Sequence, residues 1–476
     1  MPIVGAVDYF VTDAKISHTL WKLFRRDGGS RADISVLSTR PKVGRFKPGE
    51  TGALKSIQYL YFTVFLIFIG VYSLAFELWL ASGVSPWIVG DWLINYSGGF
   101  VRRGLEGSVV LLIGHLTRIP LNLVVYGMQS VVFVLFLWLV WRLVQGIRWT
   151  FLIAAVFLSP ATLEFSVLDY SAGFRKEILL FAALALVIYV LQFRQLSDLR
   201  LSALLTIIAV GLTLSHEALL VGTPYFFAAV AICGGVRALK ICAAPLILGL
   251  VSLIAVYSHP GSVATAQAIC SSVGGKFSYF PVDDPSSVCS GSIEWLQATL
   301  PQARAVFFPT LHNFHFARFY GLLAIPTFAP LFAQLIVFYR RDGLHRAVMV
   351  TFWSTSLALG ATAVLLYSGM DWGRWIHMQA MCLMLMLLMI EHEAEGKAAP
   401  IKPLERPLRY ASALALFLYS TIWTLPFLPW GPHQGYLDVA RGLRYMGRNT
   451  LNLREHAQIS ALNSHQLPRG HSAQQW

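Results

Sequence analysis

The stretch at residues 121–141, LNLVVYGMQSVVFVLFLWLVW, decides the fold, because it contains no charged side chain. A helix of about 20 apolar residues is long enough to cross the hydrocarbon core of a bilayer. Similar runs occur on both sides of it, so the sequence predicts an all-α polytopic membrane bundle of about 11 transmembrane helices (10–12). The expected spans are residues 57–80, 121–141, 149–166, 177–193, 201–214, 218–234, 240–258, 319–339, 347–367, 374–391 and 408–428.

The composition supports a membrane protein. Hydrophobic residues make up 56% of the 476 residues and charged residues 13%, against about 25% charged in soluble domains. No alternation of strands and helices indicates a soluble catalytic domain. The net charge of +13 is explained by basic arms and loops that meet anionic lipid head groups, and needs no nucleic-acid partner.

The distribution of Lys and Arg predicts the topology, because basic loops are retained in the cytoplasm. Basic residues are dense in the N-terminal arm and in the short loops expected inside, such as 141–149 and 339–346. We therefore expect the N-terminus in the cytoplasm. The predicted parts are a basic, partly disordered cytoplasmic arm (1–56), a transmembrane domain (57–430) and a C-terminal tail (431–476). The expected outer loops, which include amphipathic interfacial helices, are 81–120, 160–177, 259–318 and 368–375.

One apolar stretch, 201–234, is interrupted by Ser215, His216 and Glu217. It forms either two full spans or two short helices that meet within the membrane. A polar break at that depth would have to line a protein-enclosed or watery cavity, because its backbone groups need partners.

In this topology the polar groups of four separate segments share the outer face. Charge at a membrane surface in so apolar a chain usually serves a function. The candidate catalytic residues are Asp91, His216 and Glu217. The candidate residues for a pyrophosphate or a sugar are Arg102, Arg103, Asp169, Arg175, Lys176, Asp371, Arg374 and His377.

Two of these segments repeat one pattern, in which Tyr-Ser-Gly/Ala-Gly-Phe precedes basic residues at 96–103 and again at 170–176. Small residues let backbone N–H groups face an anion, and a helix start adds a favourable dipole. Arg supplies a planar fork that suits phosphate oxygens. The alternative is a pair of tight turns whose basic side chains reach lipid phosphates.

The acid and imidazole groups each have two interpretations. Asp91 could serve as a general base for an acceptor hydroxyl, or it could cap a helix or pair with Arg102. His216 and Glu217 could form a functional pair or a hydrogen-bonded contact between helices. The aromatic rings beside Asp371 suit either an interface belt or the face of a sugar.

Cysteine and metal signals are limited. Cys270 and Cys289 both fall in the largest outer loop, where an oxidising exterior would allow a disulfide; two free thiols are the alternative. The sequence carries no metal-site signature and predicts no cofactor, although a divalent cation bridging carboxylates to a pyrophosphate stays open. The absence of a Walker-type GxxxxGK[ST] loop argues against a nucleotide-driven pump.

Three pieces carry a resemblance to a known class: GDWLINYSGGFVRRGL at 90–105, FRKEILL at 174–180 and GMDWGRW at 369–375. With the hydropathy layout, they resemble bacterial surface-polysaccharide enzymes, either O-antigen or exopolysaccharide polymerases or membrane glycosyltransferases of the GT-C fold. The resemblance implies a location in a bacterial inner membrane, an outward-facing cavity and a polyprenyl-pyrophosphate-linked sugar donor. It also implies a catalytic acid in the first outer loop, which is Asp91 here, or outer-loop arginines with a histidine.

The leading hypothesis is glycosyl transfer at the outer face of the cytoplasmic membrane. The donor is a lipid-linked saccharide, the acceptor is a saccharide or a lipid-linked saccharide, and membrane lipids and other polysaccharide-assembly proteins are the candidate partners. The alternative is a transporter or flippase of a lipid-linked or anionic solute, although the chain lacks the repeated halves of many transporters. An assembly partner or an acyl-transfer protein is a third hypothesis.

Overall fold

The computed structural model describes residues 52–82, 85–145, 147–169, 173–194, 196–274, 288–341, 343–394 and 406–428. The chain divides into two compact units, Met1–Ile57 and Gln58–Trp476. Of the first unit, only the beginning of one helix is described, and all that follows concerns the second. The predicted arm before residue 52, the predicted tail and residues 170–172 of the second repeated motif lie outside the described residues.

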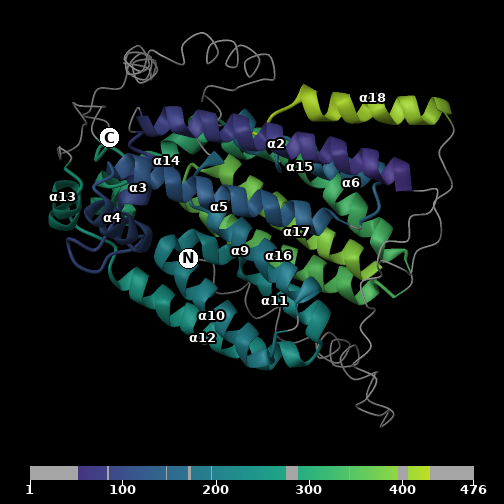
Figure 1. The fold of residues 1–476 in the computed structure, drawn as a ribbon. Coiled ribbons are helices and arrows are strands. Elements are labelled where there is room, and N and C mark those ends of the chain that lie inside the picture. Colours follow the sequence, from purple (N-terminus) through teal and green to yellow (C-terminus); the bar gives the residue numbers. More distant parts are fainter. Residues whose placement is uncertain are drawn as a thin grey trace, which may run out of the picture. The chain divides into compact units, whose positions relative to one another are not determined.

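Every regular element in the described ranges is a helix (Figure 1). The elements are α2 (Gly52–Ser82), α3 (Val89–Leu93), α4 (Leu105–Thr117), α5 (Leu121–Val144), α6 (Phe151–Phe157), α7 (Phe165–Leu168), α9 (Glu177–Phe193), α10 (Asp198–Ser215), η2 (Glu217–Gly222), α11 (Thr223–Gly234), α12 (Arg237–Ser258), α13 (Val263–Ser272), η3 (Glu294–Gln297), α14 (Leu300–Asn313), α15 (Phe316–Tyr339), α16 (His345–Ser368), α17 (Trp372–Ala394) and α18 (Arg406–Ile422). The predicted all-α class is confirmed for this part of the chain.

Several helices begin at a polar residue whose side chain accepts a hydrogen bond from the first turn. Thr150 caps α6, Ser197 caps α10 and Ser262 caps α13. Thr299 forms a full capping box with Gln302 at the start of α14. Each cap satisfies a backbone N–H group that has no partner within its own helix.

Helix α17 is the centre of the bundle. It packs against α5, α9, α11, α15 and α16 (Figure 1), and its apolar window is entirely buried. Methionines supply many of its contacts with neighbouring helices, and all five methionines between residues 378 and 389 are buried. Flexible, polarisable Met side chains fill irregular gaps between neighbouring helices. Helices α10 and α12 form a second tightly packed pair beside this centre.

Among the described residues, eight helical segments are long and apolar enough to cross a membrane. They are Gln58–Ala75, Leu121–Val144, Asp198–Ser215, Glu217–Gly234, Arg237–Ser258, Phe316–Tyr339, His345–Tyr367 and Trp372–Ala394. Three shorter apolar helices, Leu105–Thr117, Glu177–Phe193 and Ala411–Ile422, do not reach that length. A multi-pass helical protein is thus indicated. The predicted count of about 11 spans is not confirmed by the eight segments of the described ranges.

The expected span at 149–166 is wrong as a continuous helix. It is divided into α6 and α7, which are separated by turns that contain Pro160. Proline has no N–H group to continue a helix. The hydroxyl of Thr162 donates to the carbonyl of Val156 at 2.6 Å and thereby satisfies a helix end that would otherwise be unpaired. The hydropathy of residues 149–166 does not reveal this hydrogen bond.

The interruption in 201–234 separates two helical segments. His216 adopts an extended backbone (φ −167°) between the end of α10 and the start of η2. Its ring nitrogen Nδ1 accepts a hydrogen bond from the backbone N–H of Ala218 at 3.1 Å. Of the two sequence interpretations, the structure has two consecutive segments, each of which meets the length criterion for a span.

The segments predicted to face outward contain short helices and one covalent link. Helices α13 and α14 occupy the described parts of 259–318. Cys270 and Cys289 form a disulfide with a Cα–Cα distance of 5.8 Å, the pairing expected from the sequence. The disulfide joins α13 to the segment around Cys289. This segment contacts the loop before α3, because the backbone N–H of Ser292 donates to the carbonyl of Pro86.

Candidate functional site

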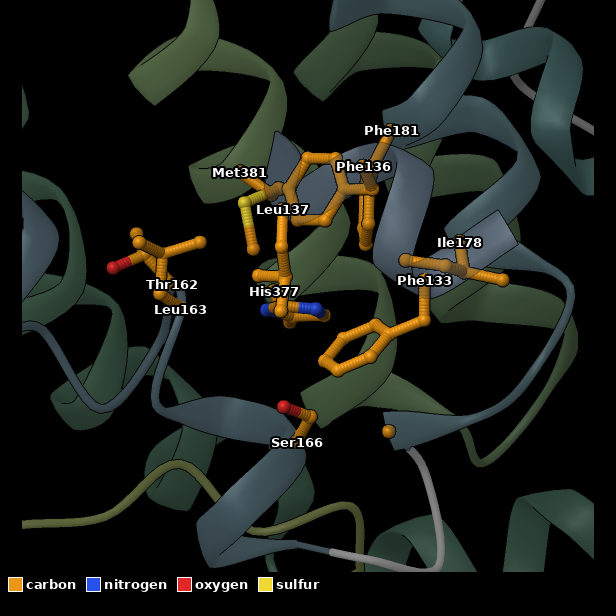
Figure 2. A pocket seen from close by; sticks show the side chains of 11 residues that line it. Phe133, Phe136, Leu137, Thr162, Leu163, Ser166, Ile178, Phe181, His377 and Met381 are labelled. Carbon is orange, nitrogen blue, oxygen red and sulfur yellow. The ribbon is translucent and has the colours of Figure 1, made fainter. Parts of the chain in front are cut away.

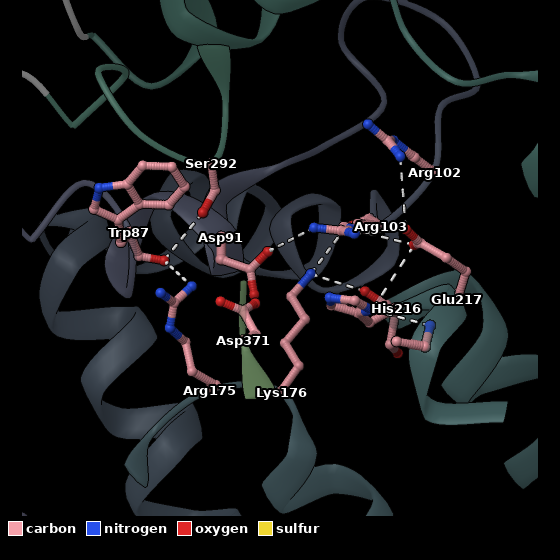
Figure 3. Close-up of polar contacts among 12 residues, drawn as sticks. Trp87, Asp91, Arg102, Arg103, Arg175, Lys176, His216, Glu217, Ser292 and Asp371 are labelled. Atoms are coloured by element: carbon pink, nitrogen blue, oxygen red, sulfur yellow. Dashed lines mark hydrogen bonds and ion pairs between the residues drawn. The ribbon is translucent and has the colours of Figure 1, made fainter. Parts of the chain in front are cut away.

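The candidate residues gather at one end of the bundle. Helix α3, the loop before α4, the starts of α9 and α17 and the junction of α10 with η2 all contribute to one charged cluster (Figure 3). We call this set of side chains the charged cluster: Asp91, Arg102, Arg103, Glu106, Arg175, Lys176, Glu177, His216, Glu217, Asp371 and Arg374. The segments that sequence analysis placed on one face therefore do meet in the fold.

Arg103 and Glu217 form an ion pair in which two guanidinium nitrogens contact the carboxylate. Arg103 Nε lies 3.2 and 3.0 Å from the two carboxylate oxygens, and Nη2 lies 2.5 Å from Oε1. Arg102 Nη1 approaches the same carboxylate at 3.7 Å. Arg103 also has a positive φ of 67°, which is uncommon outside glycine and costs free energy. The fold thus holds Arg103 in a strained backbone conformation with its guanidinium fixed by Glu217.

Lys176 is the buried hub of the cluster, with no exposed surface. Its Nζ donates to the carbonyls of Arg103 and Ser215, both at 3.0 Å, and to Glu106 Oε2 at 3.3 Å. All three ammonium donors are therefore used. We expected Lys176 to bind pyrophosphate; the structure instead gives it the role of joining the Arg103 loop, α4 and the end of α10.

Arg374 is held by two carboxylates. It donates to Glu177 across the bundle and to Asp371 at 2.7 Å. The carboxylate of Asp371 keeps about a third of its surface exposed (35%), whereas Arg374 is buried (4%). This arrangement places one acid at the open edge of the cluster and fixes the arginine behind it.

Arg175 has a different environment. Its Nη1 donates to the carbonyl of Trp87 at 2.8 Å, and Ser292 Oγ donates to the same carbonyl at 3.1 Å (Figure 3). The guanidiniums of Arg175 and Arg374 each lie 5.8 Å from the ring centroid of Phe427. Burial and the neighbouring Arg374 lower the pKa of Arg175 to about 10, so Arg175 remains a cation at neutral pH.

Asp91 is the most unusual group of the cluster. Its side chain is 2% exposed, and neither carboxylate oxygen accepts a hydrogen bond from any described residue. Its nearest ion partner is Arg103, at 4.0 Å. Burial alone would raise the pKa of Asp91, but the field of Lys176, Arg103 and the other basic groups lowers it below the ordinary value. Asp91 is thus an ionised carboxylate with its lone pairs unused.

His216 is not poised as a base at Nδ1, because that nitrogen accepts the N–H of Ala218. Burial and the nearby Arg103 lower the pKa of His216 to about 3, so the ring is neutral at pH 7. In a neutral imidazole with Nδ1 as acceptor, Nε2 carries the proton. His216 is therefore the N-cap of η2, and Glu217 is a positioning group for Arg103.

Two other expected site residues lie apart from the charged pairs. His377 sits one turn deeper on α17, in a cavity lined mainly by aromatic and aliphatic side chains (Figure 2). Its Nδ1 lies 2.9 Å from the carbonyl of Ala161, and its ring stacks on Phe165 at 4.0 Å. Asp169 accepts a hydrogen bond from the backbone N–H of Phe427. We therefore assign packing and anchoring roles to these two residues.

Three members of the site were given no role by sequence reasoning, although two of them, Glu106 and Glu177, belong to the polar groups of the expected outer loops. Glu106 and Glu177 each neutralise a buried base. Their place beside the basic residues of these loops, at the first turns of α4 and α9, was the available signal. Phe427 lies in the last predicted span and looked like an ordinary apolar residue. Its contact with two arginines depends on the chain returning to the cluster after α18.

The search for other similarities and sites was negative. The chain matches no protein-family description, no curated protein and no solved structure. Within the described ranges, no group of three or more His, Cys, Asp or Glu side chains is arranged to hold a metal ion.

Proposed function

We propose that this protein transfers a glycosyl group from a polyprenyl-pyrophosphate-linked saccharide to a hydroxyl of a saccharide or lipid-linked acceptor. The reaction takes place at the outer face of a bacterial cytoplasmic membrane, with the N-terminus in the cytoplasm. The product would be a surface polysaccharide of the O-antigen or exopolysaccharide kind. The resemblance of 90–105, 174–180 and 369–375 to polysaccharide polymerases and GT-C enzymes motivates this proposal.

The observation that carries the proposal is the state of Asp91. A buried carboxylate without hydrogen bonds is costly, and such groups concentrate at functional sites. Because the surrounding bases keep it ionised, Asp91 can accept the proton of an acceptor hydroxyl as that oxygen attacks the anomeric carbon. General-base assistance of this kind contributes about 10²- to 10⁴-fold to a rate.

Arg102 and Arg103 supply the complementary charge for the leaving group. Their side chains keep 28% and 24% of their surface exposed, so they are the accessible cations of the cluster. As the glycosidic bond forms, the bond from the anomeric carbon to the phosphate oxygen breaks, and its electron pair leaves with the polyprenyl pyrophosphate. Fixed guanidiniums stabilise this developing charge without reorganisation. Glu217 holds Arg103 in place for that role.

The test is reconstitution of the full-length protein in liposomes with a polyprenyl-pyrophosphate-linked oligosaccharide. We expect longer saccharide chains and released polyprenyl pyrophosphate in equal amounts. Release should fall sharply in Arg103→Lys, because an ammonium cannot reproduce the two-nitrogen fork that contacts Glu217. Movement of the labelled lipid-linked saccharide between leaflets without chain growth would instead indicate a transporter and refute the proposal.

A further inference from the structure

A rigid aromatic surface stands beside the charged cluster, at the accessible edge of the loop before α4. Phe100 is 42% exposed. Its ring stacks on Tyr96 with a centroid distance of 5.4 Å and an interplanar angle of 20°. The edge of His259 meets Phe100 at 5.1 Å and 87°. We call Tyr96, Phe100 and His259 the aromatic platform.

The backbone around the platform is fixed rather than loose. Gly104 lies directly against the Tyr96 ring, where a Cβ atom would collide with it. A Cβ atom on Gly98 would lie 2.9 Å from the backbone of Thr265 in α13, so this loop is pressed onto that helix. The backbone N–H of Arg102 donates to the carbonyl of His259 at 3.1 Å. The loop backbone is therefore fixed on both sides of Phe100 in the sequence, while the Phe100 ring itself keeps an exposed surface.

Two polar donors without partners in the described part of the chain belong to the same loop as Phe100. The hydroxyl of Tyr96 is buried, and no described residue forms a hydrogen bond with it. Burial, with a smaller contribution from Glu106, raises the pKa of Tyr96 to about 12, so the hydroxyl keeps its proton. Arg102 Nε is likewise buried without a hydrogen-bond partner among the described residues. An acceptor supplied by a ligand would satisfy these two donors.

An aromatic face combined with hydroxyl and guanidinium donors matches the chemistry of a pyranose ring. The C–H face of a sugar packs on an aromatic ring, and its hydroxyl rim needs hydrogen-bond partners. A phenylalanine that only anchors a loop in the lipid interface needs neither a stacked partner nor nearby donors. Because Phe100 is three residues from Arg103, a sugar on this ring would lie next to the reacting groups.

We propose that the aromatic platform is a saccharide-binding subsite, with Phe100 as the stacking ring and Tyr96 and Arg102 as hydroxyl partners. The inference rests on the proposed function for its place in a reaction, since it assigns the platform to the saccharide acceptor. The binding step itself is independent of catalysis and is measured without it.

The experiment is saturation-transfer NMR on the purified full-length protein in micelles. The probes are the methyl glycosides of glucose, galactose, mannose, rhamnose and N-acetylglucosamine. At least one probe should receive saturation at its ring protons, and its Kd should rise about three- to tenfold in Phe100→Leu, which keeps the apolar surface but removes the aromatic face. Phe100→Trp should retain binding.

The matched control is Phe352→Leu, because Phe352 is also 42% exposed but lies on the apolar helix α16. This variant should bind the probes as the native protein does. The proposal is overturned if no probe binds, or if the Phe100→Leu and Phe352→Leu variants bind equally.

Failure of the two proposals can be told apart. Sugar binding that depends on Phe100, without any glycosyl transfer, would support the saccharide-binding subsite and refute the proposed enzymatic function. Glycosyl transfer by the native protein, with sugar binding unchanged in Phe100→Leu, would support the enzymatic function and refute the saccharide-binding subsite.

Discussion

Replacement of Lys176 by Met tests the assignment of this side chain to the architecture of the site. The change removes a fully buried ammonium and leaves three acceptors without their donor: the carbonyls of Arg103 and Ser215 and the carboxylate of Glu106. Each unsatisfied buried carbonyl costs about 1–3 kcal/mol. Loss of one partner of a buried ion pair costs about 3–5 kcal/mol in total. We expect Lys176→Met to lower the free energy of unfolding by at least about 3–5 kcal/mol, because the two carbonyls add to the loss of the ion pair.

The assay is SDS-induced unfolding in mixed micelles, with a double-variant cycle. Glu106→Gln removes the other charge, so the double variant should be less destabilised than the sum of the single variants, by at least about 1 kcal/mol. Lys240→Met is the matched control, because Lys240 is an exposed lysine on α12, and its effect should stay within about 0.5 kcal/mol. A Lys176→Met effect as small as that of the control, or strict additivity with Glu106→Gln, would refute the reasoning.

Three further predictions concern stability. The pKa of His216 is about 3 in the folded protein and about 6.5 in the unfolded chain, so the folded state loses up to about 1.4 kcal/mol of stability per pH unit as the pH falls below about 6.5. His216→Gln should therefore flatten the dependence of the free energy of unfolding on pH between 7 and 5, and an unchanged slope would contradict this. Replacing Cys270 and Cys289 together by Ser should lower the free energy of unfolding by about 3 kcal/mol, because the loop is no longer closed. Reductant should lower the stability of the native protein by the same amount and leave the stability of the double variant unchanged. Tyr225→Phe should cost about 0.6–1.7 kcal/mol, because the hydroxyl donates to Gln379 at 2.9 Å inside the bundle; an unaltered unfolding curve would show that this bond contributes nothing.

The sequence predicted the class of the fold and the grouping of the site for one physical reason. Long apolar runs have few alternatives to membrane-spanning helices, and their alternation fixes which loops share a face. That logic brought Asp91, Arg103, Glu217 and Arg374 to one end of the bundle, where the structure also has them. It could not resolve helix breaks such as the one at Pro160, since hydropathy does not register a side-chain hydroxyl that satisfies a helix end.

The sequence could not predict which charged residues of the site have a structural role and which remain accessible. Charged side chains of one type look alike in a sequence, yet Lys176 is fully engaged by two backbone carbonyls and Glu106, while Arg102 and Arg103 keep exposed surface. His377 looked like a member of the surface turn because it follows Arg374 by three residues. One helical turn is enough to move it from the charged cluster into an aromatic cavity. Distinctions of this kind depend on tertiary contacts and not on residue type.

The most direct measurement is the rate of glycosidic-bond formation by Asp91→Asn in liposomes that carry the lipid-linked saccharide donor. Asparagine has nearly the same shape but cannot accept the proton, so the rate should fall about 10²- to 10⁴-fold, while sugar binding and the unfolding curve stay close to those of the native protein. Transfer by Asp91→Asn at the native rate would contradict the account, because the buried carboxylate would then have no part in the reaction.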